Sequence, residues 1–159
     1  MKSNKKANAQ TYCDSDTLLI CDILSISFDG SVANTHLYQR AMNTTEKHVF
    51  LQISAQYKSL SDSLLQGMAP LLKDSGTMNL EAGYIAKAYL TALKSSDKNA
   101  PNRVMSVNRQ ALKRIKKMVN SMKNRLFANW ISKHLAWIQI TLDYVQHRRA
   151  QAVSRSACA

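Results

Sequence analysis

The sequence of 159 residues is poor in residues that interrupt helices and poor in cysteine. It contains four glycines, two prolines and three cysteines. An all-β fold needs a turn-forming residue at nearly every hairpin, so this scarcity argues against one. Cys13, Cys21 and Cys158 are an odd number without metal-ligand spacing. They are unlike the disulfide framework of a small secreted domain and indicate a reducing compartment.

Acidic residues are also scarce, and the shortage is confined to one part of the chain. Ten Asp and Glu face 22 Lys and Arg, which gives a net charge of +12. Residues 1–97 hold nine cations and nine acids, whereas residues 98–159 hold thirteen cations and a single acid, Asp143. The last third therefore carries the whole excess. Such segregation predicts a basic surface that meets nucleic acid, anionic lipid or an acidic protein.

Long apolar runs are missing as well. The run from Leu18 to Ile26 is interrupted by Asp22, and it is far shorter than the roughly 20 residues that span a bilayer. Residues 1–6 are basic, as a signal peptide requires, but polar residues follow where its apolar stretch should begin. We therefore expect a soluble, cytoplasmic protein without a transmembrane segment.

What the sequence has is enough apolar residues, 45% of the total, to build a core. We expect an all-α fold, a helical bundle of four to five helices. Residues 1–16 are predicted to form a loose N-terminal tail and residues 17–155 a single helical domain, with a neutral part at 17–97 and a basic part at 98–155. Residues 18–28 fit either a helix or a strand, and a helix is favoured because no partner strand follows.

Helical periodicity predicts a long helix near 34–66, which starts at Asn34 or Thr35 and stops at Gly67. Its apolar positions recur at steps of three and four: Tyr38, Met42, Thr45, Val49, Ile53, Tyr57, Leu60 and Leu64. A further helix is predicted over 79–93. Its expected core-facing residues are Leu80, Tyr84, Ala88 and Ala92, with Ile85, Tyr89 and Leu93 as additional candidates.

A basic pair of helices is predicted near 103–153. Apolar residues recur at helical spacing through this segment, and it contains neither proline nor glycine. A single helix of that length would have to bury its apolar stripe against something outside the domain, so two antiparallel helices are expected.

The strongest local feature is the segment 103–125, which holds eight cations and no acid. On a helix, most of these cations fall opposite Ile115, Met118 and Met122. Closely spaced like charges repel each other, so the segment predicts an external anion. The candidate nucleic-acid-binding residues are Arg109, Lys113, Arg114, Lys116, Lys117, Lys123 and Arg125, with Arg148 and Arg149 in support. We expect phosphate contacts and no reading of bases, because no recognition module is present.

Aromatic residues on the last helix have two interpretations. Trp130, His134, Trp137, Tyr144 and Arg148 can share one side of it. Core packing is the ordinary explanation for aromatics at helical spacing, and stacking on the bases of a single strand is the alternative.

Catalytic motifs are not found. The four histidines lack zinc-site spacing, and the sequence has neither a glycine-rich phosphate loop nor a nucleophile elbow. We therefore expect no enzyme activity, no catalytic residues, no metal and no cofactor.

These features predict a non-catalytic nucleic-acid-binding helical protein, with a role as a subunit of a larger nucleoprotein complex. The alternative is a structural or adaptor subunit that docks on an acidic protein partner through the helix at 34–66 and the basic pair. The type of nucleic acid and the choice between homo- and hetero-oligomer stay open.

One short segment resembles a known family. The residues Leu37-Tyr38-Gln39, followed by Ile53-Ser54-Ala55-Gln56, resemble the helical subunits of bacterial R-bodies over about twenty residues. Because the resemblance includes none of the basic third, no function is taken from it.

Overall fold

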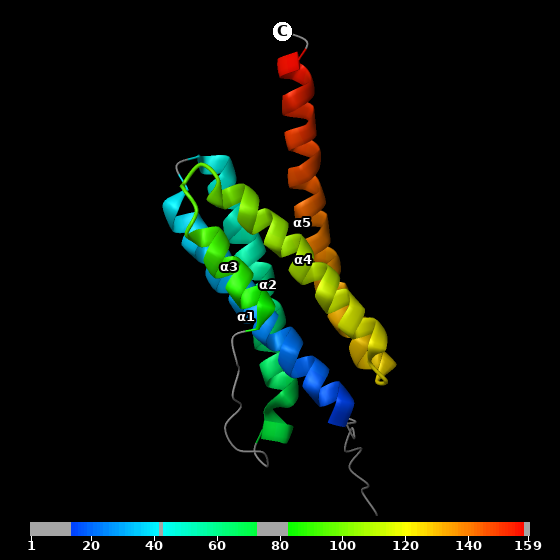
Figure 1. The fold of residues 1–159 in the computed structure, drawn as a ribbon. Helices are drawn as coiled ribbons and strands as arrows, with labels where there is room; N and C mark the ends of the chain where they lie inside the picture. The colour runs from blue at the N-terminus through cyan, green and yellow to red at the C-terminus, as the bar shows by residue number, and fades with distance from the viewer. Residues whose placement is uncertain (1–13, 42, 73–82, 158–159) are drawn as a thin grey trace, which may run out of the picture.

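The chain folds into a bundle of helices (Figure 1). The structure is a computed structural model that describes residues 14–41, 43–72 and 83–157. Its helices are α1 (Asp14–Arg40), α2 (Thr44–Leu72), α3 (Tyr84–Leu93), α4 (Ala100–Ser121) and α5 (Arg125–Ala157). The described ranges contain five helices and no strand, which confirms the predicted all-α bundle. Residues 18–28, which the sequence left between helix and strand, lie within α1.

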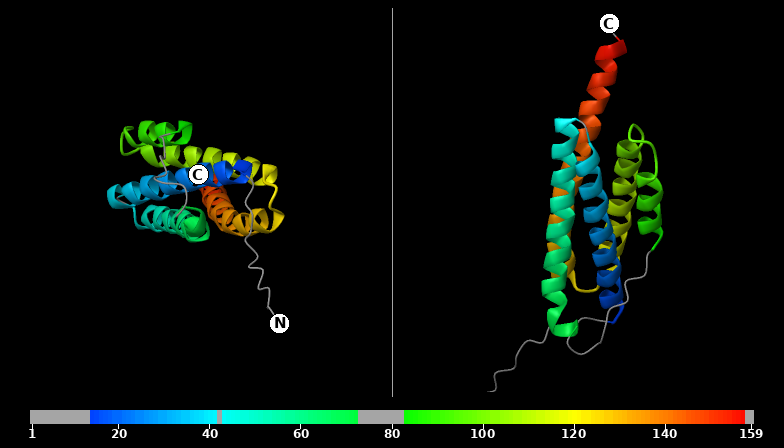
Figure 2. Two further views of the ribbon diagram at one scale, coloured as in Figure 1. Left: turned by 90° about the horizontal axis from the view of Figure 1, so that it is seen from below. Right: turned by 90° about the vertical axis from the view of Figure 1, so that its left-hand side faces the viewer.

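Four of the helices surround a common core, and the fifth lies outside them. α1 packs against α2 and α4, and α5 packs against the same two helices from the other side. The short helix α3 lies against α1 and α4 (Figure 2). The last turns of α5 extend past the end of the bundle. In this arrangement the side of α4 that faces away from the core is exposed to solvent next to α3.

The predicted single helix over 34–66 is wrong, because two helices share this range. Residues 34–40 are the end of α1, and α2 begins at Thr44. The Asn43 side chain accepts a hydrogen bond from the backbone N–H of Thr45 at 2.8 Å, as residues that cap a helix start do. Leu37 and Phe50 are both buried in the core. In the sequence, the apolar spacing of Tyr38, Met42, Thr45 and Val49 runs across the end of α1, so periodicity alone does not reveal the break.

Other predicted boundaries also move. α2 continues past Gly67 to Leu72, so this glycine does not stop the helix. A Cβ at Gly67 would meet the Phe127 ring at 3.7 Å, an ordinary contact distance. α1 begins at Asp14, within the predicted tail at 1–16, whose first thirteen residues lie outside the described ones. α3 begins at Tyr84, and residues 79–82 of the predicted helix also lie outside the described residues. The basic pair near 103–153 is confirmed as α4 and α5.

A buried polar cluster joins α1, α3 and α4. Asn34 and Asn108 are both 0% exposed, and their side-chain amides exchange two hydrogen bonds, at 2.9 and 3.0 Å. The Tyr89 hydroxyl donates to Asn108 Oδ1 at 2.7 Å, and Asn34 Nδ2 also donates to the Gly30 carbonyl at 2.7 Å. Burial raises the pKa of Tyr89 well above its usual 10.0, so the hydroxyl remains a donor. The polar side-chain groups of Asn34, Asn108 and Tyr89 therefore all have hydrogen-bond partners, as buried polar groups require.

A second buried polar contact fixes the turn between α4 and α5. Asp16 of α1 is 1% exposed, and its carboxylate accepts hydrogen bonds from the backbone N–H groups of Lys123 at 2.9 Å and Asn124 at 2.8 Å. Burial by itself raises the pKa of Asp16. These hydrogen bonds and the charges of Lys123 and Arg125 oppose it, and the net pKa lies below the ordinary 3.8.

Replacement of this carboxylate, Asp16→Asn, is expected to reduce the free energy of unfolding by about 1 to 3 kcal/mol at neutral pH, because hydrogen bonds to a charged group are lost. A carboxylate with a lowered pKa in the folded state stabilises fully above its unfolded pKa, near 3.8, and this contribution disappears as the pH falls through the lower folded value. Urea unfolding of both proteins should therefore show a difference at pH 7 that shrinks well below pH 4. An equal difference at both pH values would contradict the assignment.

Candidate nucleic-acid interface

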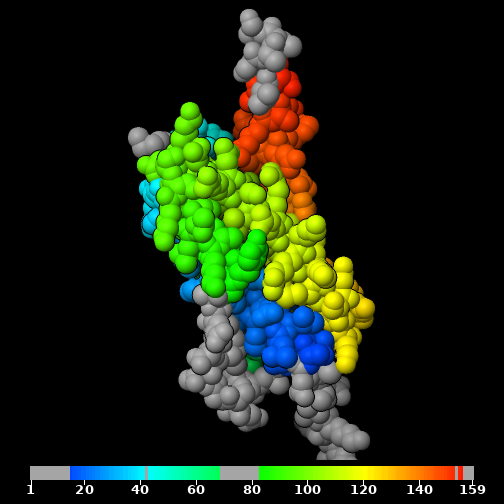
Figure 3. Space-filling view, in the orientation of Figure 1, coloured from blue at the N-terminus to red at the C-terminus, as the bar shows by residue number. Residues whose placement is uncertain are grey.

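The solvent side of α4 carries a cluster of cations. The buried side of the helix includes Ile115, Met118 and Val119, which belong to the bundle core. On a helix of 3.6 residues per turn, the positions between them point outward. Five predicted site residues lie there, all exposed: Arg109, Lys113, Arg114, Lys116 and Lys117. We call these five residues the α4 basic face. Figure 3 shows α4 at the surface between α3 and α5.

The α4 basic face has no carboxylate partner among the residues that the structure describes. The two ion pairs within those ranges lie elsewhere, between Arg40 and Asp97 and between Lys58 and Asp62. Lys116 donates a hydrogen bond from Nζ to Gln139 Oε1 at 2.8 Å, a neutral partner. Within the described residues no member of this face forms an ion pair, although Arg114 borders a hollow together with Asp22 and Asp29.

Two further predicted residues extend the face toward the turn between α4 and α5. Lys123 and Arg125 are exposed, and their charges lower the pKa of the nearby Asp16 carboxyl. Arg125 also donates from Nη1 to the Asn120 carbonyl at 3.3 Å. This end of the basic surface is close to one buried carboxylate, so its field is weaker than that of the α4 basic face.

The structure separates the remaining two predicted residues from this cluster. Arg148 and Arg149 line a groove of about 340 Å³ between α5 and the start of α2, and no member of the α4 basic face borders it. The Arg148 guanidinium lies 5.7 Å from the centre of the Tyr144 ring, and its Nη1 donates to the Tyr144 hydroxyl at 3.2 Å. These two arginines therefore belong to a different surface of the bundle.

The aromatic residues of α5 divide between core and surface. Trp130 is partly buried and stacks on Phe127, with ring centres 5.2 Å apart, and it meets His134 edge-on at 4.8 Å. Burial lowers the pKa of His134. Trp137 is 64% exposed and Tyr144 is 55% exposed. Core packing thus explains Trp130, whereas Trp137 and Tyr144 point to solvent on the face that also carries Arg148.

Tyr84 is the residue that the sequence interpretation placed wrongly. It was expected to face the core, but it is 68% exposed, while Ile85 and Tyr89 are buried. The apolar residues of α3 fit two helical registers, and the one containing Ile85, Tyr89 and Ala92 is the register that packs. Tyr84 therefore lies at the exposed start of α3. It borders a groove of about 650 Å³ together with Lys113, Lys117 and other residues of the α4 surface.

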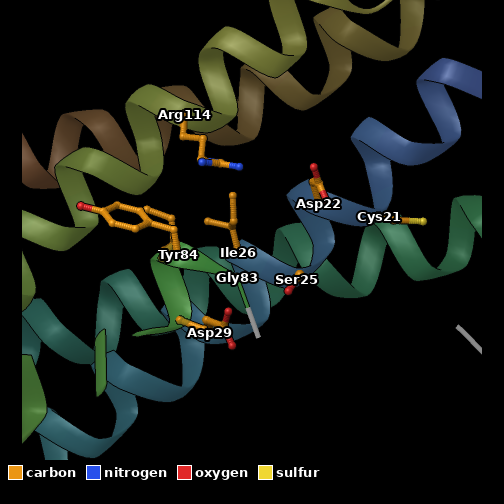
Figure 4. Close-up of a pocket in the computed structure, with 10 residues that line it drawn as sticks. Cys21, Asp22, Ser25, Ile26, Asp29, Gly83, Tyr84 and Arg114 are labelled. Carbon is orange, nitrogen blue, oxygen red and sulfur yellow. The ribbon is translucent and has the colours of Figure 1, made fainter. Parts of the chain in front are cut away.

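A smaller hollow of about 260 Å³ lies on the other side of Tyr84, between α1, the start of α3 and α4. Its walls include Asp22, Asp29, Tyr84 and Arg114, which Figure 4 shows around it. Burial raises the pKa of Asp29 and, together with the charge of Asp22, that of the Cys21 thiol. The two hollows thus share Tyr84 and Arg114, with Asp22 and Asp29 in the smaller one and the lysines of α4 in the larger one.

The described residues offer neither a membrane-spanning helix nor a group of metal ligands. None of their helices combines the length and the apolar character that crossing a bilayer demands. Within the same ranges, no three His, Cys, Asp or Glu side chains come together in a group that could hold a metal ion.

Comparisons with known proteins add no functional information. No protein-family model, curated protein or solved structure matches the chain. The likeness of residues 37–56 to R-body subunits is therefore a short sequence resemblance only, and the site rests on its geometry and charge.

Proposed function

We propose that this protein binds nucleic acid without catalysis, through phosphate contacts made by the α4 basic face. Lys123 and Arg125 extend the surface at the end of the helix, and the rest of the bundle holds α4 rigid. The protein acts as a component of a nucleoprotein complex.

The observation that carries this proposal is the exposed α4 basic face without a carboxylate partner among the described residues. Cations one helical turn apart repel each other by a few tenths of a kcal/mol per pair. A phosphate chain relieves this repulsion, and it releases its condensed counterions when the cations replace them. Both effects favour a polymer of phosphates over a single small anion.

Salt dependence of binding tests the proposal. With about five to seven phosphate contacts, the logarithm of affinity for a duplex should fall with the logarithm of salt concentration at a slope of roughly −4 to −6. Fluorescence anisotropy of a labelled duplex across a salt series measures this slope. Absence of binding at low salt, together with an unchanged ratio of absorbance at 260 and 280 nm after purification at low and at high salt, would refute the proposal.

The second candidate function is that of an adaptor subunit docked on an acidic protein. The observation in its favour is the exposed apolar side of α5, where Trp137, Ile140 and Tyr144 are all more than half exposed. Protein interfaces are enriched in such aromatic residues. Competition separates the two candidates, because an acidic partner that binds while nucleic acid does not, at the same moderate salt, supports the adaptor.

A further inference from the structure

The groove between α3 and α4 combines the two groups that hold a single strand of nucleic acid. The α4 wall supplies Lys113, Arg114 and Lys117, and the α3 wall supplies the exposed ring of Tyr84. Among the residues that the structure describes, no acidic side chain lines this groove of about 650 Å³. A groove lined by cations follows a phosphate backbone, and an aromatic ring beside it offers a surface for a base.

The position of Tyr84 is fixed by its neighbours. Ile85 and Ala86 are buried, so they anchor the first turn of α3 against the bundle while Tyr84 remains outside. The tyrosine is therefore held at the rim of the groove by a rigid helix.

The charges on the two sides of Tyr84 determine on which side of the ring a bound phosphate backbone can lie. Asp22 and Asp29 line the hollow beside the tyrosine and repel phosphate (Figure 4). Lys113 and Lys117 line the neighbouring groove, which Tyr84 also borders. A backbone that follows the cations of α4 thus has the acidic hollow at its side. The bases can turn toward Tyr84, because an uncharged base is not repelled by the two carboxylates.

We propose that this groove binds single-stranded nucleic acid, with its phosphates on Lys113, Arg114 and Lys117 and one base stacked on Tyr84. The proposal rests on the proposed function and deepens it by naming the form of the nucleic acid. In a duplex the bases are stacked on each other inside the helix, so they do not reach the tyrosine. A duplex therefore gains only the phosphate contacts, whereas a single strand gains these contacts and the stacking.

Binding by the variant Tyr84→Ala tests this inference. Stacking of one base contributes enough that its loss should weaken binding of a labelled thymidine oligomer of about 15 nucleotides by about 5- to 150-fold. The affinity for a duplex of the same length should stay within about twofold, because its phosphate contacts are unchanged. Tyr84→Phe should keep single-strand affinity, because the ring remains. Phe28→Ala is the matched control, since it removes another exposed aromatic ring, and Phe28 lines neither the groove nor the hollow beside it.

The outcomes separate this inference from the proposed function. If neither polymer binds at low salt, the proposed function fails and the inference fails with it. If both polymers bind but Tyr84→Ala leaves single-strand affinity unchanged, only the inference is overturned. Equal losses on single strand and duplex, or an equal loss with Phe28→Ala, would overturn it as well. Circular dichroism of each variant shows whether the bundle is intact.

Discussion

Triple charge reversal of Lys113, Arg114 and Lys117 to glutamate is expected to weaken nucleic-acid binding by roughly 100-fold or more at about 0.1 M salt. Each phosphate contact contributes about 0.9 to the log–log salt slope on a duplex, so the loss of three should also flatten that slope by roughly three. All three side chains are exposed, so the bundle should remain folded, which circular dichroism of the variant checks. Fluorescence anisotropy over a salt series measures both the affinity and the slope.

A matched control distinguishes the effect of where the charges lie from the effect of the net charge. Reversal of Lys94, Lys98 and Lys133 to glutamate also lowers the net charge from +12 to +6, because each replacement changes it by two. These three lysines are exposed and line neither the α4 groove nor the hollow beside it. We expect a much smaller loss of affinity with this variant. Equal losses with the two variants would mean that only the overall charge matters, and the assigned site would be wrong.

Replacement of the central buried asparagine, Asn108→Ala, is expected to lower the free energy of unfolding by about 2 to 4 kcal/mol. The substitution leaves the Asn34 amide and the Tyr89 hydroxyl without their shared partner in the core. Each buried polar group without a partner costs about 1 to 3 kcal/mol. Urea unfolding followed by circular dichroism measures the loss. The exposed Asn120→Ala, on the same helix, is the control and should cause little change.

A double replacement distinguishes the cost of buried polar groups without partners from the cost of lost side-chain volume. Asn34→Leu combined with Asn108→Leu removes both amides, so fewer polar groups stay buried without a partner than in either single variant. The double variant should therefore be more stable than the sum of the two single losses predicts. Additive losses would show that the two amides contribute independently, contrary to the paired hydrogen bonds between them.

Local sequence pattern identified the helices better than their ends. The apolar spacing along α4 and α5 is regular enough to predict both helices and their antiparallel pairing. In the sequence, the apolar spacing runs without interruption from the end of α1 into α2, although Thr45 on this stripe is exposed. A break that the apolar spacing does not interrupt leaves little signal beyond helix-start residues such as Asn43 and Glu46.

The cations of the candidate site could be named from the sequence, but their grouping could not. Charge counts and helical spacing select Arg109, Lys113 and Lys117 as outward residues, because the core positions of α4 are apolar. The same counts grouped Arg148 with these cations. Only the packing of α5 against α2 shows that Arg148 lies on a different surface. Tyr84 was missed because an amphipathic helix of ten residues fits two registers, and its neighbours on α1 and α4 choose between them.

The sequence by itself determined the helical class, the basic last third and the outward cations of α4, because these depend on residue type and on a period of 3.6. The tertiary structure decided which surfaces come together. It placed Asp16 under a turn more than one hundred residues away and joined Asn34 to Asn108. It also set Tyr84 beside the α4 cations. Contacts between distant segments depend on how whole helices pack, and no local pattern contains that information.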